Sequence, residues 1–350
     1  LSDEMFKQKD KNVNIKIGKI ISNEDIIPKD VDPHLLTNIY KKHVYNLKKG
    51  KKTFLQTQNA IAHSDNIQLI KKELKNSEVL GKTNDGKIIY LYKYIPESLI
   101  LNELGRLREI SFRKVNEGVN KKRDTDKYDK YYQHIILWDE DDLEIVGAYR
   151  VGNSKEIYEK YGFDGFYSNT LFKFKQNFTS YMNSSIELGR SFVQPKYWGS
   201  RALDYLWYGI GAYLKKHPNI KYMFGPVSLS ASLPPIGQDL IVGFYSHYFF
   251  PKKKLVNEIQ QFKYNFEHED ELSICPEQNY KDDLKLLKNS LKSIDSCIPT
   301  LYKQYSELCE DGGVSFHGFN VDPNFSNCID GFILVEVSKI KESKKTRYIK

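Results

Sequence analysis

The chain has 350 residues, an apolar content of 40% and a formal net charge of +8 from 53 basic and 45 acidic side chains. This length and apolar content suit one large domain, or one domain with an additional fragment, around a substantial core. No apolar run approaches the roughly 18 residues that a membrane-spanning helix needs. The basic charge comes without a zinc-finger, RNP-like or helix-turn-helix pattern, which argues against a nucleic-acid-binding protein.

Cysteines and histidines are spaced too widely for a metal centre or a disulfide framework. The four cysteines form no Cys-x-x-Cys pair, and the eight histidines do not cluster. We therefore expect reduced thiols, a cytosolic protein and no bound metal. Lysines concentrate at residues 48–52, 252–254 and 341–345. Each cluster is either a solvated loop or a surface that attracts an acidic partner.

The first 95 residues show only short periodic stretches. Residues 12–19 alternate between apolar and polar side chains, which predicts one strand. Residues 34–76 are charged and helix-like, with an interruption at Gly50, and residues 88–94 form a predicted strand. We interpret residues 34–95 as a connector or accessory segment.

Apolar spacing becomes more regular from residue 96 onward. Helical spacings and period-two runs follow one another, and Gly or Pro residues close several of them. Sequence pattern alone therefore predicts an α+β or α/β domain over residues 96–350. The predicted elements are a helix ending at Gly118, a hairpin of strands 132–138 and 144–150, a strand ending at Pro195, a helix from Ser200 to Lys216, a strand over 220–227, a helix ending at Phe250, helices near 281–294 and 299–310, and strands over 314–319 and 331–337.

The central strand, loop and helix form a potential anion site. A strand ending at Pro195 passes through a turn at Gly199 into a helix whose apolar residues recur at helical spacing. The free N–H groups of a first helical turn attract a phosphate, and Arg201 adds a positive charge. The alternative is an ordinary strand–helix unit in which Gly199 only turns the chain.

Six charged residues and one phenylalanine stand at the ends of different predicted elements. The charged side chains either form a buried network that holds a helix to the sheet, or bind a substrate. Strand alternation places Glu187 and Gly189 on one face and Arg190 on the other, so we expect no contact between Glu187 and Arg190. The seven are Arg108, Phe112, Asp126, Asp129, Arg150, Glu187 and Arg190.

Two motifs carry a family resemblance. Residues 193–203 resemble the acyl-carrier-binding loop of GCN5-related N-acyltransferases (GNAT), although Trp198 stands where a basic residue is common and the second glycine is absent. Residues 187–193 are similar to the Glu-x-x-Arg strand of acyl-homoserine lactone synthases and of ornithine-lipid N-acyltransferases, which are often labelled hemolysin-like. The resemblance to the second group covers most of residues 97–340.

This resemblance implies a GNAT-like α+β fold, an α/β sandwich with a mixed, mostly antiparallel sheet flanked by helices. It makes residues 96–350 the N-acyltransferase domain. Residues 1–33 resemble the end of an upstream glycerolipid acyltransferase domain, whose chemistry needs a His-x-x-x-x-Asp dyad. We interpret the two such spacings in the chain, His134–Asp139 and His317–Asp322, as coincidental. Residues five apart on a strand, as predicted for the first pair, face opposite sides, and the second pair lies in a stretch rich in Gly, Pro and Asn.

The implied reaction transfers a 3-hydroxy-fatty acyl group from acyl carrier protein to the α-amine of an amino acid. Ornithine is the leading acceptor, with glycine or lysine as alternatives. Acyl-phosphopantetheine on the carrier, or acyl-CoA, is the donor substrate, and no cofactor stays bound. The resemblance places the enzyme in the cytoplasm, in peripheral contact with the anionic inner face of a bacterial membrane. The alternative functions are a synthase of acyl-homoserine lactone signals and a catalytically silent lipid-binding module.

Residue roles follow from the same resemblance and from the chemistry of amide formation. Glu187 is the predicted general base, because the attacking amine must lose a proton. Arg190 is the second predicted catalytic residue. Tyr245 and His247 are candidates to protonate the leaving thiol, although a structural role is the commoner one for a tyrosine. The predicted substrate-binding residues are Arg108, Phe112, Asp126, Asp129 and Arg150, and the predicted phosphopantetheine-binding residues are Phe192, Val193, Trp198, Gly199, Ser200 and Arg201.

Overall fold

The computed structural model describes residues 12, 15–21, 32–53, 55, 57–266 and 274–349. The chain divides into two units, of which the first comprises residues 1–61 with 120–122. Helix α2 (Pro33–Lys48) in this unit begins after Asp32, whose carboxylate accepts a hydrogen bond from the His34 N–H.

The strand predicted over residues 12–19 is not formed by residues 15–19. Only Ile20 is bridged, to Gln58, while Ile15 and Ile17 are exposed. Alternation alone does not make a strand when the backbone has no neighbouring strand to pair with. Residues 13 and 14 lie outside the described residues, as do most of residues 1–33, so the assignment of this segment to an upstream domain stays a prediction.

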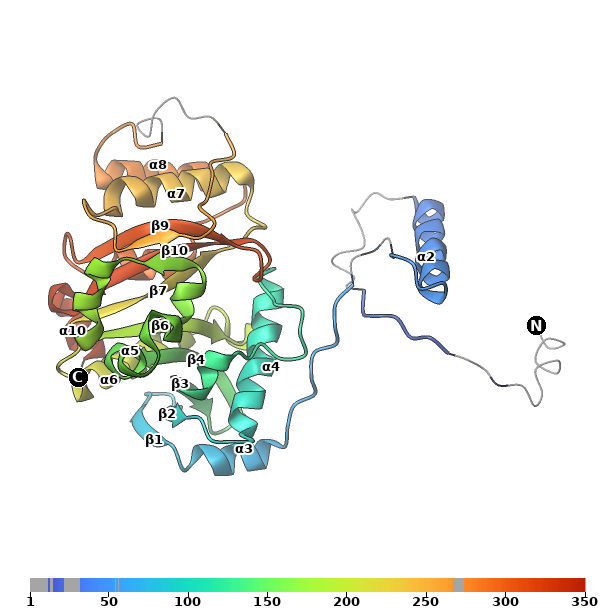
Figure 1. Ribbon diagram of the computed structural model, residues 1–350, viewed down its shortest axis with the longest axis horizontal. Helices are drawn as coiled ribbons and strands as arrows, with labels where there is room; N and C mark the ends of the chain where they lie inside the picture. Colours follow the sequence, from blue (N-terminus) through green and yellow to red (C-terminus); the bar gives the residue numbers. More distant parts are fainter. Residues whose placement is uncertain are drawn as a thin grey trace. The chain divides into compact units, whose positions relative to one another are not determined.

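The second unit, residues 62–119 and 123–350, contains an eight-stranded sheet in the order β1-β2-β3-β4-β6-β7-β10-β9 (Figure 1). Every neighbouring pair is antiparallel except β6 and β7, which are parallel. This is the mixed, mostly antiparallel sheet that the sequence predicts. Its strands are β1 (Glu78–Lys82), β2 (Ile88–Lys93), β3 (Gln133–Asp139), β4 (Glu144–Asn153), β6 (Ser185–Val193), β7 (Tyr222–Leu229), β9 (Val314–Asp322) and β10 (Cys328–Glu336).

Helices cover both faces of this sheet. Helix α6 packs on β1 to β4 with α10 beside it, and α7 packs with α8 over β9 (Figure 1). Helices α3 and α4 cover the opposite face at β2 and β3, where α4 also reaches β6. The helices are α3 (Ile67–Leu74), α4 (Leu99–Lys114), α5 (Ser154–Tyr161), α6 (Ala202–Lys216), α7 (Pro235–Phe249), α8 (Tyr280–Ser293), α9 (Thr300–Ser306) and α10 (Glu342–Tyr348).

Short elements complete the unit. Strands β5 (Phe172–Phe174) and β8 (Val256–Glu258) form a separate two-stranded sheet. The remaining elements are the 3₁₀ helices η1 (Lys127–Lys130), η2 (Gly162–Gly165), η3 (Tyr167–Thr170), η4 (Gln176–Ser184), η5 (Pro195–Tyr197) and η7 (Val337–Lys339).

The sheet is buried on both faces, which explains the nearly continuous apolar strands. In β3, Ile135 and Leu137 enter the core beneath α6, whereas Ile136 and Trp138 enter the core beneath α4. A strand covered on both sides needs apolar residues at every position, and not only at alternate ones.

The segment over residues 34–95, which we expected to be a connector or accessory segment, is divided between the two units. The second unit begins at Ala62, and the β1–β2 hairpin of this segment extends the main sheet.

Strands β6 and β7 separate at the centre of the sheet. Their pairing stops after Glu187 and Phe224, although both strands continue. A Cβ atom on Gly225 would lie only 2.0 Å from the Leu188 carbonyl oxygen, so the last close approach of the two backbones requires glycine. The separation opens the middle of the sheet.

A bulge in β6 lies beside this separation. Gly189 pairs with Arg150 and Phe192 pairs with Ala148, so that Arg190 and Ser191 together oppose one residue of β4. Arg190 has a φ of 47°, which is uncommon for a residue other than glycine. A bulge of this kind leaves its extra residue unpaired and redirects its side chain.

Candidate active site

The separated strands enclose an inner cavity of about 100 Å³. Its walls come from β6 and β7 beyond their last pair, from the end of α4 and from β10. The residues around it are Phe112, Glu117, Tyr149, Tyr167, Leu188, Gly189, Arg190, Ser191, Pro226, Val227, Ser228, Leu301, Tyr305, Phe325 and Asp330.

A larger and more apolar outer cavity of about 520 Å³ adjoins the inner one. Phe112, Glu117, Ser191 and Leu301 line both cavities. The other lining residues are Ser111, Val115, Phe192, Val193, Tyr197, Trp198, Gly199, Ser200, Leu203 and Thr300. A ligand that fills the outer cavity therefore reaches the mouth of the inner one at the bulge.

The loop predicted to bind phosphopantetheine forms part of the outer cavity. Phe192, Val193, Trp198, Gly199 and Ser200 line it. The Trp198 Nε1–H donates to the Val193 carbonyl at 2.8 Å while its ring stays 48% exposed, and Gly199 takes the positive φ of 77° that the turn requires. The loop thus presents an aromatic wall and polar backbone together.

Arg201, the sixth predicted residue of this loop, lies elsewhere. Its guanidinium group stands over the Tyr205 ring and 3.6 Å from Asp204, and it does not line either cavity. The positive charge that we expected at the helix terminus is directed at an acidic side chain of α6 itself.

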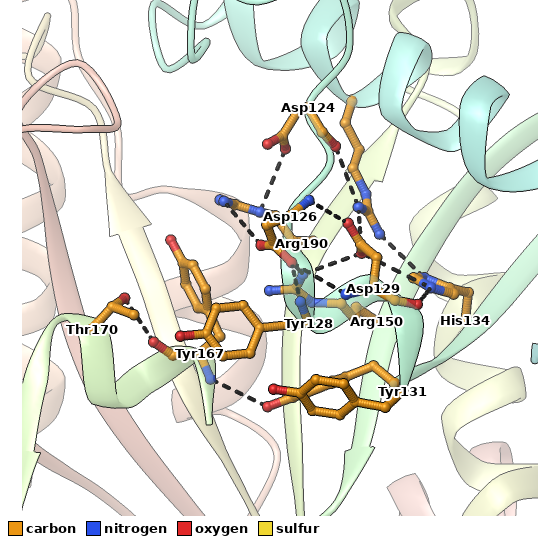
Figure 2. A network of polar contacts seen from close by, with 12 residues as sticks. Asp124, Asp126, Tyr128, Asp129, Tyr131, His134, Arg150, Tyr167, Thr170 and Arg190 are labelled. Carbon is orange, nitrogen blue, oxygen red and sulfur yellow. Dashed lines mark hydrogen bonds and ion pairs between the residues drawn. The ribbon is translucent and has the colours of Figure 1, made fainter. Parts of the chain in front are cut away.

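Five of the predicted charged residues form a network of ion pairs, in which Arg108, Asp129 and Arg150 are buried (Figure 2). Asp129 Oδ1 accepts from Arg108 Nη1 at 2.8 Å and from Arg150 Nη1 at 3.1 Å, and Arg150 Nη1 also donates to Asp126 Oδ1 at 2.7 Å. Burial alone would raise the pKa of Asp129, but the two guanidinium groups hold it well below its usual range. Arg108, Asp126, Asp129 and Arg150 line neither cavity. Their placement favours the network role over direct substrate contact.

Arg190 connects this network to the inner cavity. Its Nε lies 3.4 Å from Asp124 Oδ2 and its Nη2 lies 3.7 Å from Asp126 Oδ2, both longer than strong ionic hydrogen bonds. The guanidinium group is sandwiched by the rings of Tyr167, at 4.6 Å, and Phe325, at 5.2 Å. Phe112 packs edge-on against Phe325 in the same wall. Arg190 is therefore the network cation that borders the inner cavity.

Two members of the network were not predicted. Asp124 pairs with Arg190, and His134 Nδ1 lies 3.2 Å from Arg108 Nη2 (Figure 2). Burial and then Arg108 lower the pKa of His134 to about 3, so its imidazole is neutral. The loop composition around Asp124 marked it only as charged, and His134 attracted notice only through its spacing to Asp139.

Glu187 is buried on β6 and has a complete set of partners. One carboxylate oxygen accepts from the Ser168 N–H at 2.7 Å, and the other accepts from the Tyr132 hydroxyl. Burial raises the pKa of Glu187. Glu187 lines neither cavity.

The predicted face of Arg190 is wrong. Tyr132 binds Glu187 and also accepts from the Tyr167 N–H, while the Tyr167 ring covers Arg190. Both charged residues therefore border the same η3 segment instead of opposite faces. The bulge, with its extra residue, breaks the two-residue alternation on which the prediction depended.

Two acidic residues that the sequence analysis did not select line the inner cavity. Glu117 follows α4, and Asp330 lies on β10. Burial and then Asp330 raise the pKa of Glu117 to about 8, and burial raises the pKa of Asp330 to about 7. A sequence signal existed for Asp330, because it interrupts the otherwise apolar strand that begins Cys328-Ile-Asp-Gly-Phe.

Tyr245 and His247 line neither cavity. Tyr245 packs among aromatic rings of α9 and β9, including Tyr302 and Phe316. Among the described residues, no group of His, Cys, Asp and Glu side chains has a geometry suited to a metal ion. The described helices also include none whose length and hydropathy would allow a membrane crossing.

The mixed sheet, its opened β6–β7 junction and the loop that lines the adjoining cavity agree with the GNAT-like fold and carrier-binding loop that the sequence resemblance implies. A family model described as an acetyltransferase (GNAT) domain matches residues 107–208. The chain is 30% identical to the glycine Nα-acyltransferase of Phocaeicola vulgatus over 81% of this chain and 90% of that enzyme. The chain belongs to the amino-acid Nα-acyltransferases of the GNAT family.

One further relative and one solved structure extend the comparison. The chain is 29% identical to the L-ornithine Nα-acyltransferase of Agrobacterium fabrum, over 67% of this chain and 74% of that enzyme. Among solved structures, it is similar to the CoA-dependent acyl-homoserine lactone synthase BjaI, with 11% identity and a TM-score of 0.36 over 75% of this chain and 87% of that one.

Proposed function

We propose that this enzyme transfers a 3-hydroxy-fatty acyl group from acyl carrier protein to the α-amine of glycine. The observation that carries the proposal is the pair of adjoining cavities of different size, which meet at the β6 bulge. The outer cavity suits a thioester with a long apolar substituent, and the inner cavity suits a small acceptor. Glycine is preferred over ornithine because the similarity to the glycine enzyme spans nearly that enzyme's whole length.

The donor occupies the outer cavity in this proposal. Phe192, Trp198 and Leu203 supply apolar wall for the acyl chain and the pantetheine arm. The thioester carbonyl faces the bulge, where a backbone N–H released from strand pairing stabilises the oxyanion of the tetrahedral intermediate. This assigns the oxyanion donor to the backbone of residues 190–191, at the bulge.

The acceptor occupies the inner cavity, with its carboxylate at Arg190. A guanidinium group suits a carboxylate because it offers parallel N–H donors. The contacts of Arg190 to Asp124 and Asp126 are long, which leaves it able to bind a further anion. Ornithine is the second candidate, because two acidic side chains in the inner cavity, Glu117 and Asp330, can accept hydrogen bonds from a side-chain ammonium group.

Glu187 acts in this proposal as a positioning residue, although we first predicted it as the base. A base must lie within hydrogen-bonding distance of the proton it removes, directly or through a water molecule. Both carboxylate oxygens of Glu187 are occupied by Ser168 and Tyr132. Through these hydrogen bonds, Glu187 holds the η3 segment in place, and the Tyr167 ring of this segment covers Arg190.

The test is thiol release from 3-hydroxypalmitoyl carrier protein, and separately from the matching acyl-CoA, with glycine, ornithine or lysine as acceptor. Mass spectrometry of the product should find N-acylglycine, with faster release from the carrier protein. An exposed amide substitution on α5, Glu159→Gln, is the matched control and should release thiol at the wild-type rate.

Three results would replace the proposal. Faster release with ornithine would make ornithine the acceptor. A nucleoside-containing product would indicate a signal synthase. No release with any amine, together with binding to anionic vesicles, would indicate a silent lipid-binding module.

A further inference from the structure

Glu117 is held at the junction of the two cavities by the backbone around it. Its N–H donates to the Phe112 carbonyl at 2.8 Å. The Ser230 hydroxyl donates to the Val115 carbonyl at 2.9 Å, and the Ser326 hydroxyl donates to the Gly118 carbonyl at 3.0 Å. The Glu117 carboxyl group therefore enters the cavity wall from a fixed loop, next to the place where the thioester sulfur of a bound donor would lie.

Asp330 stands deeper, in the inner cavity only, and is 3% exposed. It accepts from the Ser228 hydroxyl of β7 at 2.7 Å, and the Cys328 thiol of its own strand lies 3.7 Å away. Asp322 of β9 and Glu117 add negative charge around it, and Arg190 of β6 adds positive charge. Asp330 thus faces the position of an acceptor whose carboxylate lies at Arg190.

We propose, resting on the acyltransferase function above, that Asp330 removes a proton from the acceptor ammonium group and that Glu117 donates a proton to the departing thiolate. These positions follow from the cavities, because Asp330 borders only the acceptor cavity whereas Glu117 borders both. Two carboxyl groups with different environments can divide the acid and base roles of one reaction.

Atoms and charge balance through these two groups. Asp330 takes one of the three ammonium protons, and the neutral amine forms a C–N bond to the thioester carbonyl carbon. The C–S bond breaks, and the thiolate takes the proton of Glu117. The amide nitrogen then gives up its second proton, which restores Glu117, and Asp330 releases its proton to water. The products are N-acyl amino acid, free thiol and one proton.

Other polar groups of the inner cavity suit these roles less well. Burial raises the pKa of Tyr149 to about 12 and also raises the pKa values of Tyr167 and Tyr305. These phenols stay protonated near neutral pH, so none of them can remove a proton there. Ser228 is committed to Asp330, and Arg190 has no basic form in this pH range.

The base is tested with Asp330→Asn and two acceptors. With glycine, the variant should lose at least about 100-fold in kcat, the usual contribution of a general base. With aminooxyacetate, whose amine is already neutral at pH 7, the loss should shrink to below tenfold. Equal losses with both acceptors would mean a structural role and overturn the proposal. If the loss shrank with aminooxyacetate for Glu187→Gln and not for Asp330→Asn, the base would be Glu187.

The acid is tested with Glu117→Gln and two donors. Release from the acyl-pantetheine thioester should fall about tenfold or more, whereas release from an acyl aryl thioester should remain near the wild-type rate, because an aryl thiolate leaves without protonation. An equal fall with both donors would overturn the role of Glu117.

Folding and the underlying function are controlled separately. Circular dichroism and thermal melting should show that both amide variants fold, and Glu159→Gln should match wild type in every assay. If wild-type enzyme releases no thiol with any amino acid, the acyltransferase function itself fails. If wild type is active and Asp330→Asn retains full kcat with glycine, only the acid–base assignment fails.

Discussion

Asp330 and Glu117 carry carboxyl groups into partly apolar surroundings, and burial sets the pH range in which each can act. Asp330 must be ionised to accept a proton, so activity should rise with pH through its pKa of about 7. Glu117 must be protonated to donate, so activity should fall with pH through its pKa of about 8. We expect a bell-shaped profile of kcat between about pH 5 and pH 10, with these limits.

The two amide variants separate the limbs of this profile. Residual kcat of Asp330→Asn should lack the rise on the acidic side, and that of Glu117→Gln should lack the fall on the alkaline side. Steady-state thiol release across the pH series is the measurement. A wild-type profile that is flat between pH 6 and pH 9 would contradict both assignments.

The same burial lowers stability. Burial raises the pKa of Asp330 from the usual value of about 4 for an aspartate to about 7, so the folded state binds the proton more tightly, and stability falls as pH rises from about 4 to about 7. The ionised carboxylate then costs on the order of 4 kcal/mol of unfolding free energy. Asp330→Asn should therefore melt at a higher temperature than wild type at pH 8, with little difference at pH 4. Differential scanning fluorimetry at the two pH values measures this, and a difference independent of pH would exclude burial of the charge as its cause.

At the scale of elements, the pattern of apolar residues predicts most of the helices and strands of the second unit. The β3–β4 hairpin, β6, α6, β7, α7 and the final strands lie within a few residues of the expected ranges, because each is bounded by Gly, Pro or a change of period. The β6 bulge was not predictable in this way. A bulge depends on the register of the neighbouring strand, and nothing local to Arg190 specifies which residue β4 leaves without a partner.

The β6–β7 junction gives an element-scale prediction. Gly225→Ala places a Cβ atom 2.0 Å from the Leu188 carbonyl oxygen, so a backbone must move and the free energy of unfolding should fall by about 3 kcal/mol or more. Gly81→Ala on β1, where a Cβ meets nothing within 4 Å, is the matched control and should change stability little. Chemical denaturation of both variants tests this, and equal midpoints would show that the junction tolerates a side chain.

At the scale of the molecule, a net charge of +8 favours an acidic carrier protein as the form in which the donor arrives. Raising sodium chloride from about 0.05 to 0.5 M should increase KM for acyl carrier protein severalfold, because salt screens contacts between exposed charges. The KM for acyl-pantetheine, which lacks the protein, should stay nearly constant. An unchanged KM for the carrier protein would argue against electrostatic docking.

The candidate site was predictable only in part, for reasons that also lie at this scale. Residues 187–201 are contiguous, and a motif can identify them. The carboxyl groups of Glu117 and Asp330 are separated by more than two hundred positions, and only the closing of β10 beside β7 brings them to one cavity. Pairing of distant strands is a property of the whole sheet, so the spacing of residues within one segment does not predict it.

The network of alternating charges also constrains how such sequences diverge. In order of contact, its members are Arg108, Asp129, Arg150, Asp126, Arg190 and Asp124. Each member neutralises the next, across α4, η1, β4 and β6. Loss of one member leaves the network with one charge in excess, which is more costly than loss of an oppositely charged pair. The six positions should therefore be inherited as a set, and lineages that have replaced Arg190 should have replaced Asp124 as well.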